Sequence, residues 1–129
     1  MINNESVFLC VFALIYALIE IEIEGKDGWA NTLPTPKILF HFTQYHVLMN
    51  ILVILLLFKV YYKNTKDILK CIFIISLWFV LEDTYWFIFN PYYTLKRYNK
   101  ENIGWHKWCC GLPIGSIISF IIMGVIITI

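Results

Sequence analysis

The sequence predicts an all-α integral membrane protein, organised as one up-down bundle of four transmembrane helices with a short interfacial helix between helices 3 and 4. Of its 129 residues, 60% are hydrophobic and 15% are charged, whereas a soluble domain has about half apolar and a quarter charged residues. Aromatic residues make up 18% of the chain, and many Trp and Tyr residues lie near segment ends, as in an interfacial belt. The lipid bilayer is therefore the expected partner, and the net charge of +1 argues against nucleic acid.

Four hydrophobic segments can be drawn within a single domain that covers residues 1–129. A transmembrane helix needs about 20 residues, with roughly 17 as the lower limit. The expected helices cover about residues 6–23, 38–58, 68–90 and 112–129.

Two of these helices can reach that length only if they carry acidic residues into the membrane. The uncharged run before Glu20 is too short to span, so the first helix includes Glu20. The uncharged run of residues 71–81 is shorter still, so the third helix includes Glu82 and Asp83 and ends before Pro91. Ionisable residues inside a membrane are costly, which makes these residues candidates for a functional site.

The up-down order brings these groups to one side of the membrane. The end of the first helix, the start of the second and the end of the third share that side. At 1.5 Å per residue, Glu20 lies about 8 Å from its helix end and His46 about 12 Å from its own. His41 lies about 140° around the second helix from His46, so it is expected to lie outside the site. The predicted one-sided pocket is centred on Glu20, His46 and Asp83, with Glu82 and His106 as further members.

The loop of residues 91–111 is expected to lie over the same side. Leu95, Tyr98 and Trp105 can form an apolar stripe opposite the basic residues of this loop. That pattern predicts a short interfacial helix broken at Gly104, with His106 held at headgroup level above the site.

Three chemical interpretations of the cluster stay open. In the first, His46, Glu20, Asp83 and His106 bind a divalent metal such as zinc or iron, although the histidine spacing matches no metal motif. In the second, Glu20, His46, Asp83 and Glu82 are catalytic, with one carboxyl group neutral and its neighbour ionised. In the third, the same residues pair across helices and only hold the bundle together.

The leading functional hypothesis is a pocket that binds or transforms a lipid-like or other amphipathic small molecule, with metal assistance as one version of it. The alternatives are a small proton- or cation-coupled transporter or channel, expected to be oligomeric, and a structural subunit of a membrane complex. The chain contains no potassium-channel filter, P-loop, HExxH or CxxC sequence, so whether it is an enzyme stays open.

The fourth helix and the cysteines support further expectations. Gly111, Gly115 and Ser119 recur every four residues, which predicts a small-residue seam for packing or homo-oligomerisation. The vicinal pair Cys109 and Cys110 is expected to be reduced, because a direct bridge would be strained, with acylation as the alternative. The positive-inside rule favours a cytoplasmic site face, since its loops hold six basic residues against four in the opposite turn.

Overall fold

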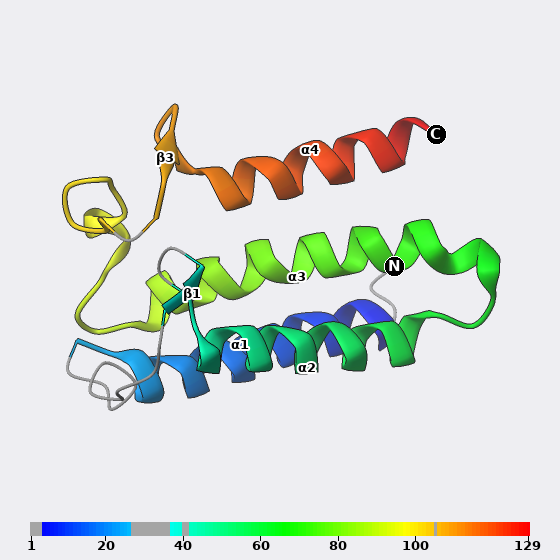
Figure 1. Ribbon diagram of the computed structural model, residues 1–129, viewed down its shortest axis with the longest axis horizontal. Helices are drawn as coiled ribbons and strands as arrows, with labels where there is room; N and C mark the ends of the chain where they lie inside the picture. Colours follow the sequence, from blue (N-terminus) through cyan, green and yellow to red (C-terminus); the bar gives the residue numbers. More distant parts are fainter. Residues whose placement is uncertain (1–3, 27–36, 40–41, 105) are drawn as a thin grey trace.

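Helices make up most of the protein (Figure 1). The computed structural model describes residues 4–26, 37–39, 42–104 and 106–129. The α-helices are α1 (Asn4–Glu24), α2 (Gln44–Tyr61), α3 (Ile68–Phe89) and α4 (Ile114–Thr128). The short elements are strands β1 (Lys37–Leu39), β2 (Phe42–Thr43), β3 (Trp108–Cys109) and β4 (Leu112–Pro113), and the 3-10 helices η2 (Thr65–Asp67) and η3 (Leu95–Arg97).

Three of the helices are long and apolar enough to cross a membrane: α1, α2, and α3 together with η2. This agrees with the prediction of a multi-pass membrane protein. The fourth helix, α4, is apolar but has only 15 residues, so it extends roughly 22 Å at 1.5 Å per residue. It is therefore shorter than the ~30 Å hydrocarbon core of a bilayer.

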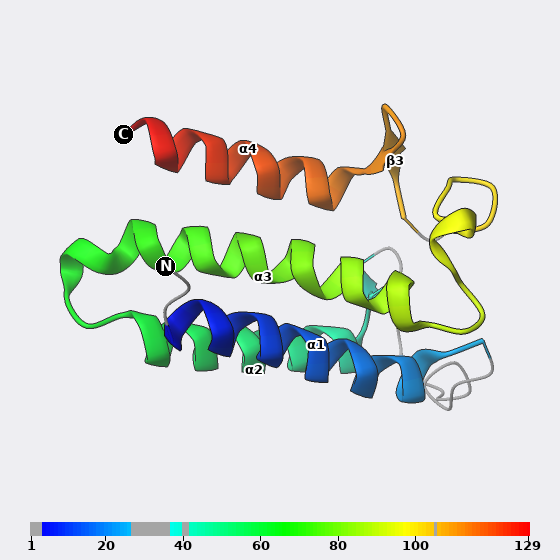
Figure 2. The ribbon, with the colours of Figure 1, turned by 180° about the vertical axis from the view of Figure 1, so that it is seen from behind.

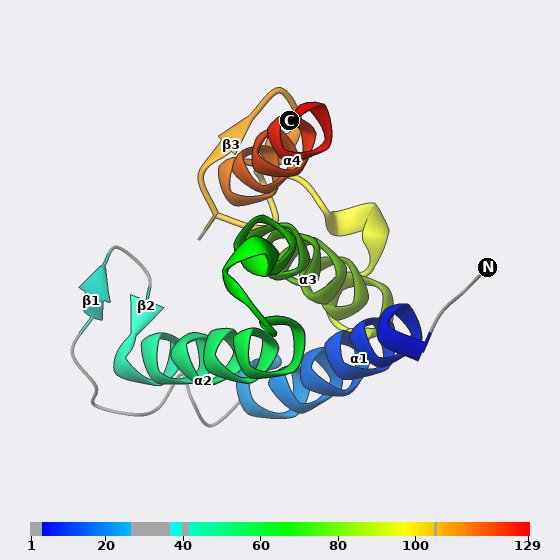
Figure 3. The same cartoon turned by 90° about the vertical axis from the view of Figure 1, so that its right-hand side faces the viewer.

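Consecutive helices run in opposite directions, and α3 is the central one (Figures 1 and 2). The main contacts between helices join α3 to α1, to α2 and to α4. Seen along the helices, α4 lies on the side of α3 that faces away from α1 and α2 (Figure 3). The helices thus form a group of three with α4 added to one side of it.

The core of the three-helix group is built around Trp78 of α3, which is 1% exposed. Its indole contacts the ring of Tyr16 edge-on, with 4.9 Å between the ring centroids, and Leu9 and Leu57 are buried in the same cluster. At the end of the molecule away from the strands, the Tyr61 hydroxyl donates to the Glu5 carbonyl oxygen at 2.7 Å. This hydrogen bond joins the start of α1 to the end of α2.

The start of the second helix differs from the expected residue 38. Residues 37–39 and 42–43 instead pair as the antiparallel strands β1 and β2, and α2 begins at Gln44. Thr43 has the extended backbone of an N-cap residue, with φ −80° and ψ 168°, and Thr is a favoured residue at that position. His46 consequently lies in the first turn of α2 rather than deep within a helix.

The segment between α3 and α4 also differs from the expected interfacial helix. Its described part contains only the single turn η3, followed by bends and the β3–β4 hairpin. The side chain of Asn99 accepts from the backbone N–H of Asn102 at 3.0 Å, and such local bonds compete with helix formation. Tyr98 packs against Phe87 of α3, whereas Leu95 is exposed. Trp105, the third residue of the expected stripe, lies outside the described residues.

The expected small-residue seam is divided between two elements. Gly111 lies in the turn of the β3–β4 hairpin, where its φ is +81°, and not on α4. Gly115 is exposed on α4, whereas Ser119 is buried together with Ser116. The three residues therefore do not share one helix face, and homo-oligomerisation through them stays a prediction.

Candidate functional site

Two acidic side chains from different helices act on each other electrostatically, and one of them, Glu82, is buried. Glu20 belongs to α1 and Glu82 belongs to α3. The residue Glu82 is 7% exposed. The charge of Glu20 acts on Glu82 across the two helices. The Oε1 atom of Glu82 is buried and has no hydrogen-bond partner among the residues that the structure describes. We refer to Glu20 and Glu82 as the carboxyl pair.

The surroundings of the carboxyl pair are acidic and aromatic. Tyr16 lies one turn before Glu20 on α1, Glu24 lies one turn after it, and the charges of the pair act on both Tyr16 and Tyr45. Within the described part of the chain, the charged groups that act on Glu82 are all acidic, and the only basic group that acts on Glu20 is His46. Two ionised carboxylates in such a setting repel each other and lose hydration, so a shared proton would relieve both costs.

A polar contact lies at the end of this cluster that is nearer the loops. Glu24, at the end of α1, accepts from His46, in the first turn of α2, with 2.5 Å between Oε1 and Nε2. The two side chains are 22% and 25% exposed, respectively. This contact joins α1 to α2 at the end opposite the bond between Tyr61 and Glu5.

The sequence around His46 fixes how its ring is oriented. The backbone N–H of Thr43 donates to Nδ1 at 3.2 Å, and the Thr43 hydroxyl lies 2.9 Å from the same nitrogen. Because Nδ1 accepts this hydrogen, Nε2 carries the hydrogen of the neutral ring and directs it at Glu24. The Asn50 side chain donates to the His46 carbonyl oxygen at 2.8 Å, so Thr43, His46 and Asn50 form one local network.

Asp83 follows Glu82 by one residue and has a different environment. Its charge interacts with that of Glu20 and with Tyr98, which belongs to the loop before α4. Burial is the main cause that raises the pKa of the Tyr98 phenol, and the charge of Asp83 adds to that effect. A hydrogen-bonding interaction with the Ser116 side chain lowers that pKa in turn. Asp83 therefore connects the carboxyl pair to the loop and α4.

The expected metal site is not assembled in the described part of the chain. No three His, Cys, Asp or Glu side chains there are placed to hold a metal ion together. His46 is engaged with Glu24 and Thr43, while His106 lies on the segment between η3 and β3. Glu20 and Asp83 supply acidic groups without a set of histidines around them. His41 lies outside the described residues.

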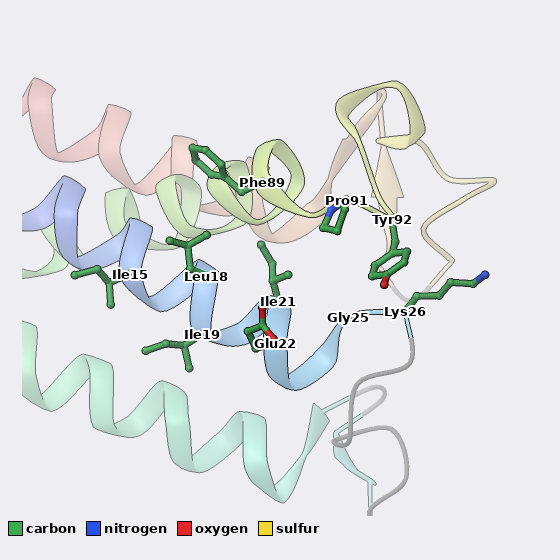
Figure 4. A pocket seen from close by; sticks show the side chains of 10 residues that line it. All are labelled: Ile15, Leu18, Ile19, Ile21, Glu22, Gly25, Lys26, Phe89, Pro91 and Tyr92. Atoms are coloured by element: carbon green, nitrogen blue, oxygen red, sulfur yellow. The ribbon is translucent and has the colours of Figure 1, made fainter.

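A groove of about 750 Å³ lies on the surface of the protein along α1 (Figure 4). The groove lies along the face of α1 that carries Ile15, Leu18 and Glu22. At 100° per residue, this face is about 170° around the helix from Glu20. The far end of α3 and the residues that follow it form the other wall. The lining residues are Ile15, Leu18, Ile19, Ile21, Glu22, Gly25, Lys26, Phe89, Pro91 and Tyr92.

The structure thus brings Glu20, Glu82 and Asp83 together and adds residues that the sequence analysis did not include. Glu24 is the partner of His46, and Tyr16 and Tyr45 surround the pair. The i, i+4 spacing of Tyr16, Glu20 and Glu24 on α1 was the available signal, because residues four apart share a helix face.

Comparison with known proteins places the chain in no family: no family model, curated protein or solved structure matches it.

Proposed function

We propose that this multi-pass membrane protein binds a lipid-like or other amphipathic molecule in the groove, and that the protonation of the carboxyl pair controls this binding. One observation carries the proposal. The groove and the carboxyl pair use the same two helices, since Glu20 and Glu82 join α1 to α3 on the inside while α1 and the end of α3 form the groove on the outside. A change in the pair therefore reaches both walls of the groove.

The chemistry of the groove fits an amphipathic ligand. Its inner part is lined by apolar side chains such as Ile15 and Leu18, while Glu22 and Lys26 lie toward the end of α1 (Figure 4). An acyl chain would lie along the apolar part. A polar headgroup that carries both signs of charge would meet the acidic and basic side chains, and Tyr92 would flank it. Lys and Tyr are common at the level of lipid headgroups.

The control step follows from the electrostatics of the pair. With one shared proton, Glu20 and Glu82 can form a carboxyl–carboxylate hydrogen bond that holds α1 against α3. Loss of that proton leaves two negative charges side by side in a medium of low polarity, which pushes the helices apart. The Glu24–His46 contact, partly exposed at the same end, is the proposed exchange point with water. The positive-inside rule favours the cytoplasm as that side.

Binding in the groove is tested with a fluorescent lysophosphatidylcholine added to the purified protein in detergent. Leu18→Trp fills the groove, and Leu52→Trp is its matched control, because Leu18 is 43% and Leu52 is 50% exposed on α1 and α2 respectively. We expect binding to weaken at least about tenfold in Leu18→Trp, about 1.4 kcal/mol, and to stay unchanged in Leu52→Trp. Equal binding by both variants would contradict the proposal.

Control by the carboxyl pair is tested by repeating the titration across pH. The affinity of the wild type for the lipid should change with pH. The affinity of Glu82→Gln should not show this pH dependence. Glu22→Gln, which removes a charge from the groove and not from the pair, should keep the pH dependence. If Glu82→Gln follows the same pH profile as the wild type, the pair has no part in binding.

A proton-coupled carrier is the second candidate, favoured by the carboxyl pair, on which no Lys or Arg charge acts among the described residues. It requires a path through the other half of the bilayer, toward which Ser76 and Ser119 supply buried polar groups of α3 and α4. Ser116 lies in the first turn of α4, at the loop end near Tyr98. A pH-sensitive dye inside liposomes would report the flux. Proton flux that disappears in Glu20→Gln would favour the carrier, whereas lipid binding without flux would favour the groove.

A further inference from the structure

The hairpin between the last loop and α4 holds two neighbouring cysteines in a fixed geometry. Strands β3 and β4 pair through Trp108 with Pro113 and Cys109 with Leu112, so Cys110 and Gly111 form a two-residue turn. Their φ angles are +52° and +81°, as in a type I′ turn, which matches the twist of the flanking strands. The backbone N–H of Ile114 also donates to the Lys107 carbonyl oxygen at 2.8 Å and closes the base of the hairpin.

Both thiols are exposed, and their sulfur atoms lie 3.6 Å apart. A direct disulfide needs about 2.05 Å between the sulfurs and Cα atoms at least about 4.4 Å apart. Neighbouring residues joined by a trans peptide have Cα atoms only about 3.8 Å apart, so direct closure is strained. The pair Cys109–Cys110 is therefore poorly placed to oxidise to its own disulfide.

A single atom placed between the two sulfurs meets no such obstacle. Two sulfur bonds of about 2.3 Å, the length of a zinc–thiolate bond, span 3.6 Å when the angle between them is about 103°. This angle is close to tetrahedral. The present side-chain positions therefore fit a bent, two-sulfur bridge, with little movement of the hairpin.

We propose that Cys109 and Cys110 form a bidentate site for a thiophilic centre, of which a trivalent organoarsenical is the best-matched class. Soft thiolate ligands select soft acceptors. The described part of the chain places no third His, Cys, Asp or Glu donor with the pair, which favours an acceptor that needs only two sulfurs from the protein. An organoarsenical carries its own third substituent.

The chemistry is a condensation without electron transfer. Phenylarsine oxide, which holds arsenic in the trivalent state, reacts with two thiols to give two arsenic–sulfur bonds. The arsenic–oxygen bond breaks, and the oxygen leaves as water together with the two thiol hydrogens. Because no oxidant or reductant is consumed, the reaction needs only the reduced protein.

The test uses the full-length, reduced protein in detergent, with Cys10→Ala and Cys71→Ala so that the pair supplies the only thiols. We expect one phenylarsine oxide per chain, both thiols consumed, and a mass increase equal to the reagent minus one water. Either Cys109→Ser or Cys110→Ser should weaken binding by about 100-fold, because the second bond is intramolecular and gains from effective concentration. A small dithiol should release the arsenical, whereas a monothiol at the same concentration should not.

Three outcomes would overturn the assignment. The single-serine variants could bind as tightly as the pair, the pair could take up two arsenicals on separate sulfurs, or the protein could arrive from its host with an acyl thioester on either cysteine. The circular dichroism of each variant, unchanged from the parent protein, serves as the control for folding. The same titration on the protein with all its cysteines shows whether Cys10 or Cys71 competes.

Discussion

The contact between Glu24 and His46 provides a stringent test of the site, because it joins α1 to α2 at the same end as the carboxyl pair. We expect a double-mutant cycle to show that the two side chains stabilise the fold together. Glu24→Ala removes the acceptor. His46→Asn removes Nε2 but keeps an acceptor atom near the position of Nδ1, so the hydrogen bond from Thr43 can persist.

The magnitude follows from the geometry of the contact. A hydrogen bond to a charged group contributes about 1.5–3 kcal/mol net to stability. The distance of 2.5 Å between Nε2 and Oε1 is short, but both side chains remain about a quarter exposed, and solvent screening reduces the contribution of such pairs. We therefore expect a coupling free energy near the lower limit, about 1.5 kcal/mol, which is roughly tenfold in the folding equilibrium.

The free energies of unfolding can be measured by titrating sodium dodecyl sulfate into the protein in mild micelles and following tryptophan fluorescence and far-UV circular dichroism. Coincident transitions from both signals justify a two-state treatment. A parallel cycle of Glu22→Ala with His46→Asn is the control, since Glu22 faces the groove, and its coupling should be zero within about 0.5 kcal/mol. Coupling that small in the Glu24 cycle as well would refute the contact.

Three further changes test other parts of the structure. Tyr61→Phe should destabilise the fold by about 1 kcal/mol in the same unfolding assay, because it removes the 2.7 Å hydrogen bond to the Glu5 carbonyl oxygen. Trp78→Ala should cost about 3–5 kcal/mol, since a side chain that is 1% exposed leaves a cavity; a loss under 1 kcal/mol would mean that the three-helix core is arranged differently. Hydrogen bonding to Cys110 raises the pKa of Cys109, so less of Cys109 is thiolate at neutral pH. Cys110→Ala, which leaves no acceptor atom, should therefore accelerate iodoacetamide labelling of Cys109 at pH 7 but not at a pH where the thiol is already ionised. Equal labelling rates at pH 7 would contradict that shift.

Length alone was enough to place the acidic residues within helices. Glu20 and Glu82 lie inside α1 and α3. This was predictable because the uncharged runs beside them are too short to span a bilayer. The helical phase alone did not show which of the neighbouring residues Glu82 and Asp83 faces α1. Glu82 shares a face with Trp78 and Trp86, and all three are buried, but one helical step separates Glu82 from Asp83. Only packing against α1 shows which of the two meets Glu20.

The start of α2 could not be obtained from hydrophobicity, because residues 38–43 are as apolar as the helix that follows. The extended Thr43 ends the β1–β2 pair and begins α2. His46 therefore lies in the first turn, where it meets Glu24 instead of the carboxyl pair. Thr at an N-cap position was the local signal for this boundary. In the same way, Cys110-Gly111 was a turn signal between short strands, which shortened α4 to Ile114–Thr128.

The central claim is that Glu20 and Glu82 share an exchangeable proton inside the protein. Infrared difference spectroscopy measures this directly, because a protonated carboxyl group gives a C=O stretching band that a carboxylate lacks. We predict such a band in the wild type at neutral pH, its loss in Glu82→Gln, and its persistence in the control Glu22→Gln. A wild-type spectrum without the band, or a band that Glu20→Gln and Glu82→Gln both leave unchanged, would contradict the account.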